Sequence, residues 1–310
     1  MTSAISIREL TKTYGRRTAV DAATYDVPRG SVCGLLGQNG AGKTTTIRCM
    51  LDLLRPTSGT IEVLGLDAQR DSVEIRRRIG YLPEEPTYYP WMRVGEITRF
   101  NAGFYPTWDQ QLCDTLIAQL GLPSDRKLRD LSRGMQAKVG LVLALSQRPE
   151  LLVLDDPTSG LDPIVRRQFF EAMIDKVHAT EGTVFFSTHL LHEMERIADE
   201  VVVMYDGRVL VRDSLEALKR SRRRLRAVFS GDSAPAAEHL PVRLVESRPH
   251  FRDFTARRFD AGLVAGLRDA GFDSVEVIDM DLEDIFVDEI GRAGGALDGA
   301  DTTTSRETAA

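Results

Sequence analysis

The chain has 310 residues, of which 42% are hydrophobic and 28% charged, and its formal net charge is −6. This length suits one large domain with a small appendage, and the negative charge argues against general binding to nucleic acid. The longest apolar runs, such as Leu151–Leu154 and Val201–Tyr205, are far shorter than the ~20 residues that a helix needs to cross a bilayer. Residues 1–5 also lack the basic and then apolar layout of a signal peptide. We therefore expect a cytoplasmic protein that acts at a membrane only through a partner.

The N-terminal part of the chain predicts strands around a single helix. Residues 1–30 alternate apolar and polar positions between turn signals, which is typical of short antiparallel strands. Ser31–Leu36 is a short buried-strand candidate that runs into a glycine-rich turn and a helix from Gly42 to about Leu54. A second strand-like set follows at Thr60–Val63.

The middle of the chain predicts helices and then a parallel sheet. Residues 109–147 read as helical, with amphipathic stretches at Asp109–Leu120 and from about Gly134 to Gln147. Two strongly apolar strands follow, Leu151–Asp155 and Thr183–Ser187, each with a helical pattern after it. That alternation indicates an α/β fold in which crossover helices cover a parallel sheet.

The composition changes after Asp213. Six of the eight residues Lys219–Arg226 are Lys or Arg, Phe259–Ala270 predicts a helix, and Ser274–Ile278 predicts a strand. The last twenty positions hold almost no large apolar groups, which favours disorder. We expect a main domain over 1–220 with a helical part at about 85–147, a small α/β accessory domain over 221–290, and a disordered tail over 291–310.

A glycine-rich loop links the Ser31–Leu36 strand to the helix that follows. It matches the pattern G-x-x-x-x-G-K-[ST], whose glycines let consecutive backbone N–H groups point at phosphate oxygens. The helix N-terminus adds its partial positive charge. Lys43 should reach the β- and γ-phosphates, and the Thr44 hydroxyl should bind Mg²⁺. The expected nucleotide-binding residues are Gly37, Gln38, Asn39, Gly40, Ala41, Gly42, Lys43, Thr44 and Thr45; the alternative is a glycine-rich turn without a ligand.

The strand Leu151–Asp155 supplies the second half of a nucleotide site. Its run of buried aliphatic residues ends in a carboxylate, so Asp155 should lie at the carboxyl edge of the sheet, where open α/β sheets bind ligands. There it can hold Mg²⁺ through water. Any buried strand can end in Asp, so Asp155 indicates a nucleotide site only in combination with the glycine-rich loop.

Residues 131–136, Leu-Ser-Arg-Gly-Met-Gln, resemble the signature segment (usually L-S-G-G-Q) of ABC (ATP-binding cassette) transporters. Ser132 is placed to cap a helix, so that its hydroxyl and free N–H groups form an anion site. The resemblance implies that Ser132, Gly134 and Gln136 contact the γ-phosphate of ATP bound to a second subunit. A simple helix cap is the alternative for this hexapeptide taken alone.

Further segments resemble the same family in the family's order, over about residues 1–215. Residues 159–162, Ser-Gly-Leu-Asp, resemble the loop that crosses the dimer interface and ends at Asp162. His189 resembles the switch histidine that contacts the γ-phosphate, and Tyr14 resembles the aromatic residue that stacks on adenine. Residues 79–84, Ile-Gly-Tyr-Leu-Pro-Glu, resemble the loop that joins the catalytic core to the helical subdomain. The implied fold is a P-loop NTPase (RecA-like) core with an antiparallel β subdomain and an α-helical subdomain.

Two positions depart from the family pattern. Glu84 stands where the family usually has Gln, a residue that helps place Mg²⁺ and the attacking water. Asp156 stands where the family usually has Glu, the general base for that water. The shorter side chain withdraws the carboxylate, so we expect normal ATP binding with slow hydrolysis; a compensating backbone shift is the alternative.

The resemblance also suggests the transported class and the partners. Residues 280–286, Met-Asp-Leu-Glu-Asp-Ile-Phe, are similar to a segment of exporter cassettes of the drug, antibiotic and bacitracin-resistance kind, and residues 104–109 are similar to a subgroup acting in cell-envelope or antibiotic responses. The implied partners are a polytopic membrane permease, encoded separately, and a second ATPase subunit, at the inner face of the membrane. In the family, the aromatic-rich region 85–108 borders the groove for the permease, so at least one of Tyr88, Tyr89 and Trp91 should be exposed.

Two other classes of protein remain as alternatives. A soluble ABC ATPase acting on ribosomes or nucleic acid finds its best support in the basic run Lys219–Arg226, but this chain has one cassette and no sustained heptads. A P-loop kinase or GTPase would not explain the signature segment, and we find no Asn-Lys-x-Asp motif of a GTPase.

Overall fold

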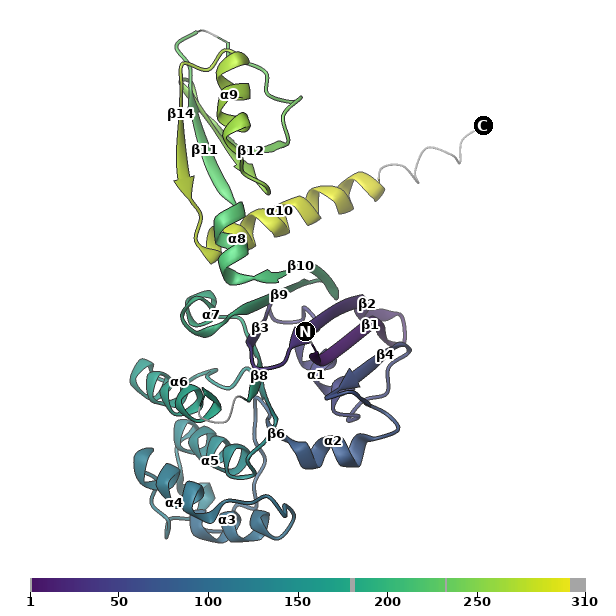
Figure 1. Ribbon diagram of the computed structural model, residues 1–310, viewed down its shortest axis with the longest axis vertical. Coiled ribbons are helices and arrows are strands. Elements are labelled where there is room, and N and C mark those ends of the chain that lie inside the picture. Colours follow the sequence, from purple (N-terminus) through teal and green to yellow (C-terminus); the bar gives the residue numbers. More distant parts are fainter. Residues whose placement is uncertain (1, 179–181, 232, 302–310) are drawn as a thin grey trace. The chain divides into compact units, whose positions relative to one another are not determined.

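The computed structural model describes residues 2–178, 182–231 and 233–301. The chain divides into two compact units, Met1–Arg212 and Asp213–Ala310, drawn in Figure 1. The division falls before the helix α8 (Leu215–Ser221), which the sequence analysis placed in the first domain. This helix belongs with the second unit because its last carbonyl, at Ser221, accepts a hydrogen bond from the Phe259 amide. Within the described ranges, no helix is both long enough and apolar enough to cross a membrane.

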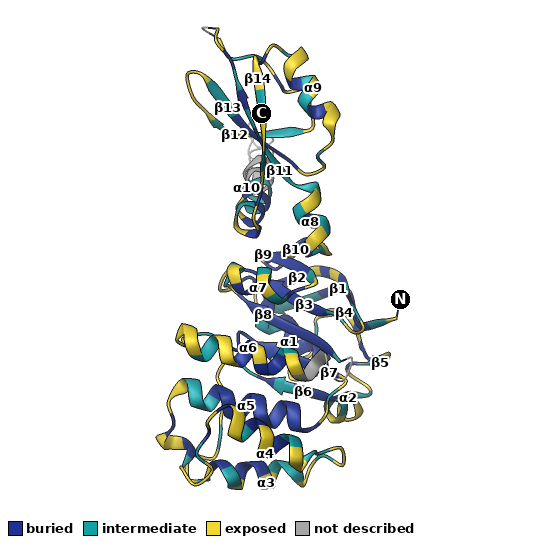
Figure 2. Cartoon of the chain, turned by 60° about the vertical axis from the view of Figure 1, so that its left-hand side comes forward, coloured by how far each residue is buried: buried dark blue, intermediate teal, exposed yellow. Residues whose placement is uncertain are grey.

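A six-stranded sheet forms the centre of unit 1, with the strand order β10-β9-β3-β8-β7-β6. The pairs β3–β8, β3–β9, β7–β8 and β6–β7 are parallel, as the sequence pattern predicts. Every residue of β3, β7 and β8 is buried, and these strands are dark blue in Figure 2. Because parallel strands end at the same edge, the segments after β3, β7 and β8 meet there. The strands are β3 (Val32–Leu36), β6 (Ile79–Leu82), β7 (Leu151–Asp155), β8 (Thr183–Thr188), β9 (Glu200–Tyr205) and β10 (Arg208–Ser214).

The antiparallel strands expected in residues 1–30 are present as a long hairpin. It belongs to a four-stranded sheet with the order β2-β1-β4-β5. The hairpin turn holds only Gly15 and Arg16, so Tyr14 and Arg17 are direct partners across the two strands. Between this sheet and the central one lies an apolar core in which Tyr25 stacks on Phe185 at 6.3 Å between ring centroids. The strands are β1 (Ser3–Tyr14), β2 (Arg17–Pro28), β4 (Ser58–Val63) and β5 (Leu66–Asp67).

The helices of unit 1 include three that lie together, α3, α4 and α5, inside the region 85–147 (Figures 1 and 2). The two amphipathic stretches predicted there are α4 and α5, and Asp109 caps α4 by accepting a hydrogen bond from Leu112 N at 2.8 Å. The helix expected to reach about Leu54 ends at Met50. The bounds are α1 (Lys43–Met50), α2 (Ser72–Arg78), α3 (Val94–Ala102), α4 (Gln110–Gln119), the 3-10 turn η1 (Leu128–Asp130), α5 (Arg133–Ser146), α6 (Pro163–His178) and α7 (Leu191–Ile197).

Unit 2 is an antiparallel sheet with the strand order β12-β13-β11-β14. One face packs on α9 through an apolar cluster that includes Leu225, Phe254, Leu267 and Phe272. The helix predicted over Phe259–Ala270 is α9, and the strand predicted over Ser274–Ile278 is β14. With α8, the elements are β11 (Arg223–Val228), β12 (Val242–Ser247), β13 (Phe251–Ala256), α9 (Ala261–Asp269), β14 (Ser274–Asp279) and α10 (Leu282–Asp301).

The disorder predicted from Gly291 onward is wrong for the first part of the tail. The helix α10 continues to Asp301. Arg292 anchors the helix there, because its guanidinium donates to Asp288 and to both oxygens of Thr255. The composition of the segment does not reveal the long-range partner Thr255, which lies on β13. The remainder of the predicted tail, residues 302–310, lies outside the described residues.

Candidate functional site

The glycine-rich loop between β3 and α1 adopts a conformation that only glycines fit easily. Gly40 and Gly42 have φ angles of +86° and +104°, in the left-handed region. A Cβ atom on Gly42 would lie 2.5 Å from the backbone oxygen of Ala19. Gly42 precedes the first residue of α1, and no side chain of the described residues caps this helix N-terminus. Its free N–H groups are therefore open to an anion.

Lys43 folds back over this loop. Its Nζ donates to the backbone oxygens of Gly37 at 2.7 Å and of Gln38 at 3.2 Å. Burial lowers the pKa of Lys43, and the charges of Asp156, Asp155 and Glu84 oppose that shift. The ammonium group is thus a buried cation (7% exposed) in acidic surroundings, and a polyphosphate would compete with those carbonyls for it.

Asp155, at the end of β7, lies directly behind the loop. Its Oδ1 accepts hydrogen bonds from Thr44 Oγ1 at 3.0 Å and from Ser187 Oγ at 2.7 Å. The residue is 1% exposed, and burial raises the pKa of Asp155 more than the two hydroxyls lower it. Burial also raises the pKa of Glu84, with a further contribution from Asp156. A buried carboxylate beside a hydroxyl offers the hard oxygen ligands that Mg²⁺ prefers, so these residues fit the ion.

Asp156 and His189 form a close pair. His189 Nδ1 lies 2.7 Å from Asp156 Oδ2, and an ionised carboxylate can only accept, so Nδ1 carries the hydrogen. Among the residues that the structure describes, the buried Oδ1 of Asp156 has no hydrogen-bond partner. The φ of Asp156 is +44°, in the left-handed region that a non-glycine residue rarely adopts. The chain thus aims one carboxylate oxygen at the histidine and leaves the other free to accept a proton.

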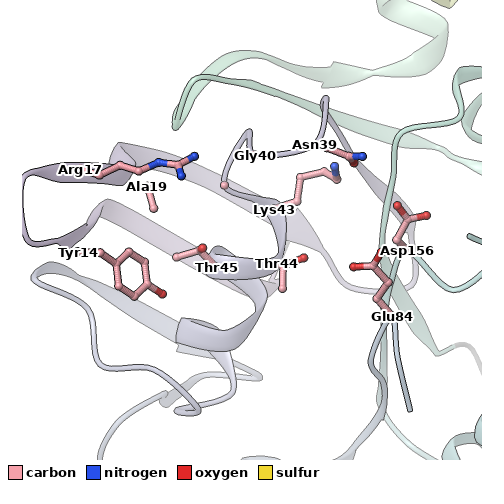
Figure 3. Close-up of a pocket in the computed structure, with 11 residues that line it drawn as sticks. Tyr14, Arg17, Ala19, Asn39, Gly40, Lys43, Thr44, Thr45, Glu84 and Asp156 are labelled. Atoms are coloured by element: carbon pink, nitrogen blue, oxygen red, sulfur yellow. The ribbon is translucent and has the colours of Figure 1, made fainter. Parts of the chain in front are cut away.

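These side chains surround one cavity of about 430 Å³, a size that suits a small ligand. In Figure 3, Tyr14 and Arg17 lie on one side of it, Glu84 and Asp156 on the other, and Lys43 and Thr44 between them. Asp155 and His189 do not line the cavity themselves. Asp155 accepts a hydrogen bond from the lining residue Thr44, and His189 contacts the lining residue Asp156. The cavity is lined by Tyr14, Arg17, Ala19, Asn39, Gly40, Gly42, Lys43, Thr44, Thr45, Glu84 and Asp156.

Arg17 and Ala19 are lining residues that the sequence analysis missed. The two-residue turn of the β1–β2 hairpin sets Arg17 opposite Tyr14, and its guanidinium lies near Gly40. The short spacing between Tyr14 and Arg17 is the one feature of the sequence that hints at a shared site. Only the hairpin register shows that Arg17 faces the cavity. Tyr14 itself is 48% exposed, with the Lys12 ammonium 5.2 Å from its ring centroid.

The residues expected to act on a second subunit lie outside this cavity lining. Ser132 caps α5 as expected, its Oγ accepting from Met135 N at 3.3 Å. Asp162 Oδ1 accepts from Ile164 N and Val165 N and so caps the start of α6. The side-chain amide of Gln136 donates to the carbonyls of Leu128 and Leu131, so both of these hydrogen bonds are made within its own chain. Gly134 sits in the first turn of α5.

The aromatic region of the helical part exposes two of the three residues named for it. Tyr89 is 45% and Trp91 62% exposed, with ring centroids 5.2 Å apart, whereas Tyr88 is largely covered and donates to Gln136 O. The expectation that at least one is exposed is confirmed. Phe100 and Phe104 extend this surface, since Phe100 packs edge-on against both Tyr89 and Phe104.

Comparison with known proteins agrees with this geometry. Residues 20–159 match the ABC transporter family model. The bacitracin transport ATP-binding protein BcrA of Bacillus licheniformis is 36% identical over 226 residues, which are 72% of this chain and 74% of that protein. Its namesake in Enterococcus faecalis is 32% identical over 82% of this chain and 81% of its own. YtrB of Bacillus subtilis, an ABC transporter ATP-binding protein, is 24% identical over 93% of this chain and 98% of its own.

Solved structures show the same fold. The structure of the ATP binding subunit of an ABC transporter has a TM-score of 0.64 and 29% identity, covering 71% of this chain and 92% of that one. A post-hydrolysis ATP-binding cassette, MJ0796 bound to ADP and Pi, has a TM-score of 0.61 at 21% identity and covers 68% of this chain and 98% of that one.

The chain belongs to the ATP-binding subunits of ABC transporters, with the P-loop NTPase fold of that family. It is an ATPase whose cofactors are ATP and Mg²⁺. Such subunits work with membrane permease subunits and form dimers.

Proposed function

We propose that this ATPase drives an exporter of drugs, antibiotics or envelope-related compounds through a separately encoded permease at the inner face of the membrane. The similarity to two bacitracin transport proteins carries this substrate class, because it extends over most of both chains. The relatives named above are transport proteins, which favours this function over the action on ribosomes or nucleic acid that the basic run Lys219–Arg226 suggested.

The cavity residues divide the work of binding ATP. Tyr14 stacks on adenine, the 37–42 loop and the α1 N-terminus hold the phosphates, and Lys43 exchanges its carbonyl partners for phosphate oxygens. Thr44 and Asp155 hold Mg²⁺, with Glu84 as a further oxygen ligand. The ion supplies charge neutralisation at the β- and γ-phosphate oxygens.

Hydrolysis rests on the pair Asp156 and His189. The free Oδ1 of Asp156 accepts a proton from the attacking water, and the contact at Oδ2 fixes the orientation of the carboxylate. His189 is 35% exposed, and when its ring carries a hydrogen on both nitrogens, Nε2 can donate to a γ-phosphate oxygen. Catalysis of phosphoryl transfer is mostly positioning and electrostatic stabilisation, which suits a site built from preset hydrogen bonds.

The signature segment acts on the other subunit. Ser132, which caps α5, and Gly134, in the first turn of α5, do not line the cavity of their own chain. They therefore need a second copy, whose γ-phosphate they close over together with Gln136 and Asp162. Gln136 has to leave its two carbonyl partners to take part.

The closure is tested by Ser132→Arg on the Asp156→Asn background, which blocks hydrolysis. We expect unchanged ATP affinity of the monomer and no ATP-dependent dimer in light scattering, because the arginine fills the space that the phosphate needs. Ser124→Arg, at an exposed serine of the same helical part, is the matched control. Dimers of the Ser132→Arg protein would disprove the role of the signature segment.

The permease docks beside the aromatic surface of the helical part. A hollow of about 260 Å³ lies there, lined by Leu53, Tyr81, Tyr88, Asn101 and Tyr105 among others. The exposed rings of Tyr89 and Trp91 suit an interface, where aromatic residues are enriched.

The export function is tested in a strain that lacks the gene. Supplying the wild-type gene should restore tolerance to bacitracin or to another envelope-active compound, whereas the Lys43→Ala gene should not, at equal protein level. Equal tolerance with both genes, or co-purification of the chain with ribosomes instead of a polytopic membrane protein, would contradict the proposal.

A further inference from the structure

A buried carboxylate lies behind the catalytic pair and has no role in the mechanism above. Glu193, on α7, is 3% exposed. It accepts hydrogen bonds from Thr158 Oγ1 at 2.9 and 3.1 Å and from Thr188 Oγ1 at 3.3 Å. The Arg166 guanidinium makes an ion pair with it, with Nε 2.9 Å from Oε1. One carboxylate therefore joins the chain after β7, the end of β8 and the start of α6.

Two of these contacts bracket the catalytic pair. Thr158 follows Asp156 by two positions, and Thr188 directly precedes His189; both threonines are fully buried. Thr188 Oγ1 also accepts a hydrogen bond from Leu190 N at 3.0 Å, so its only hydrogen is committed to Glu193. The backbone on either side of His189 is thereby tied to the carboxylate.

The third contact extends to the loop that precedes α6. Arg166 Nη2 donates to Leu161 O at 3.1 Å, and Nη1 lies 3.3 Å from His192 Nε2. Leu161 belongs to residues 159–162, the loop expected to cross the dimer interface. The same carboxylate thus connects this loop to the segment that carries His189.

The geometry points to Glu193 as a positioning residue that sets the contact between His189 and Asp156 and couples it to the 159–162 loop. This inference rests on the hydrolytic roles proposed for Asp156 and His189. Its physical basis is that a buried charge is tolerated only while all its partners stay in place, so the three segments move as one body. Burial raises the pKa of Glu193, and the hydrogen bonds and charges of Thr158, Arg166, His192 and Thr188 oppose that shift.

The test is a double-mutant cycle in the full-length chain, with Glu193→Gln, His189→Ala and the two together. The readouts are the single-turnover hydrolysis rate at saturating Mg-ATP and the affinity for ATP. We expect Glu193→Gln to slow hydrolysis about 10- to 100-fold, the scale of a misplacement near 1 Å, with ATP affinity within twofold of wild type. In the His189→Ala background it should slow hydrolysis no further, because the residue acts through His189.

Three further variants separate positioning from general stability. Thr188→Val, which removes the linking hydroxyl, should reproduce the Glu193→Gln rate, and Thr188→Ser, which keeps it, should hydrolyse at close to the wild-type rate. Glu171→Gln removes a glutamate that pairs with Arg167 on the surface, and it should have no effect.

Each result has one reading. Multiplicative losses in the double variant, or equal rates for Thr188→Val and Thr188→Ser, would overturn the positioning role while leaving the proposed function intact. A wild-type rate for His189→Ala alone would instead refute the role proposed for His189, and this inference with it.

Discussion

Among the residues whose burial the structure describes, two pairs of adjacent acidic residues are buried, and the two pairs have different partners. Asp155 and Asp156 in unit 1 are 1% and 6% exposed, and Asp288 and Glu289 in unit 2 are 5% and 1% exposed. The unit 2 pair meets arginines: Asp288 accepts from Arg243 and Arg292 as well as Thr255, and Glu289 pairs with Arg222 and Arg257. The unit 1 pair meets the hydroxyls of Thr44 and Ser187 and the ring of His189.

The pKa values of one acid in each pair, Asp288 and Asp155, follow this difference. Burial would raise the pKa of Asp288, but hydrogen bonds from Thr255, Arg292 and Arg243 outweigh it, and the pKa is lowered. Burial is also the largest influence on Asp155, where neutral hydroxyls do not outweigh it, and the pKa is raised. An acid that accepts hydrogen bonds from arginines of its own chain is structural, whereas an acid whose hydrogen-bond partners are neutral hydroxyls is suited to bind a cation from outside. The comparison thus separates a scaffold from a binding site.

The strongest test of this contrast is Lys43→Ala. Lys43 is a cation of the glycine-rich loop and lies close to Asp155 and Asp156. Without its positive charge, the two carboxylates would repel the phosphates of ATP. We expect ATP turnover to vanish and nucleotide affinity to fall strongly, measured on the purified chain. Lys127→Ala, a lysine outside the cavity lining, is the control. Hydrolysis by Lys43→Ala at the wild-type rate would show that the nucleotide site has been assigned wrongly.

Asp156→Glu addresses the departure from the family's usual base. Restoring the longer side chain moves the carboxylate by on the order of 1 Å, and a displacement of that size can change a rate about 100-fold. We expect faster single-turnover hydrolysis at saturating Mg-ATP in the assembled transporter, with ATP binding unchanged. An equal or slower rate would mean that the site is built around the shorter acid. The 2.7 Å contact of Asp156 with His189 and the φ of +44° would then be the features that place the shorter side chain correctly.

The sequence reveals local motifs better than long-range partners. The place of the glycine-rich loop could be predicted because its glycines and Lys43 must follow one another in one order, and that of Asp155 because parallel strands end at one edge. Arg17 could not, since its place depends on hairpin register. Glu193 could not either, because its partners come from three separate elements.

The same reason explains the error at the C-terminus. The composition after Gly291 is poor in apolar residues, and local pattern alone favours disorder there. The segment around Arg292 is nevertheless helical, because Arg292 donates hydrogen bonds to Asp288 and Thr255. Thr255 lies on β13, far away in sequence. A polar segment can be ordered when its charges meet partners that other elements supply.

Asp288→Asn tests the scaffold half of the comparison, with the smallest effect. The substitution removes the charge that Arg243, Arg292 and Thr255 share, which should cost about 1–3 kcal/mol of the stability of unit 2. The measurement is hydrogen exchange of the β13 amides in the full-length chain, with ATP affinity as the readout of unit 1, which should not change. Asp284→Asn is the matched control on the same helix, because Asp284 and its partner Arg224 are both about a third exposed and such pairs contribute under about 1 kcal/mol.

The pH dependence sharpens this test. Because the pKa of Asp288 is lowered in the folded chain, its stabilisation is present above the ordinary Asp pKa of about 3.9 and is lost as the pH falls through the lower folded-state value. Wild type should therefore lose protection of β13 in that acid range, and Asp288→Asn should lose less, having no such charge to protonate. If Asp288→Asn and Asp284→Asn lowered protection equally, the paired acids of unit 2 would be no more structural than a surface ion pair. The contrast with the Asp155–Asp156 pair would then rest on unit 1 alone.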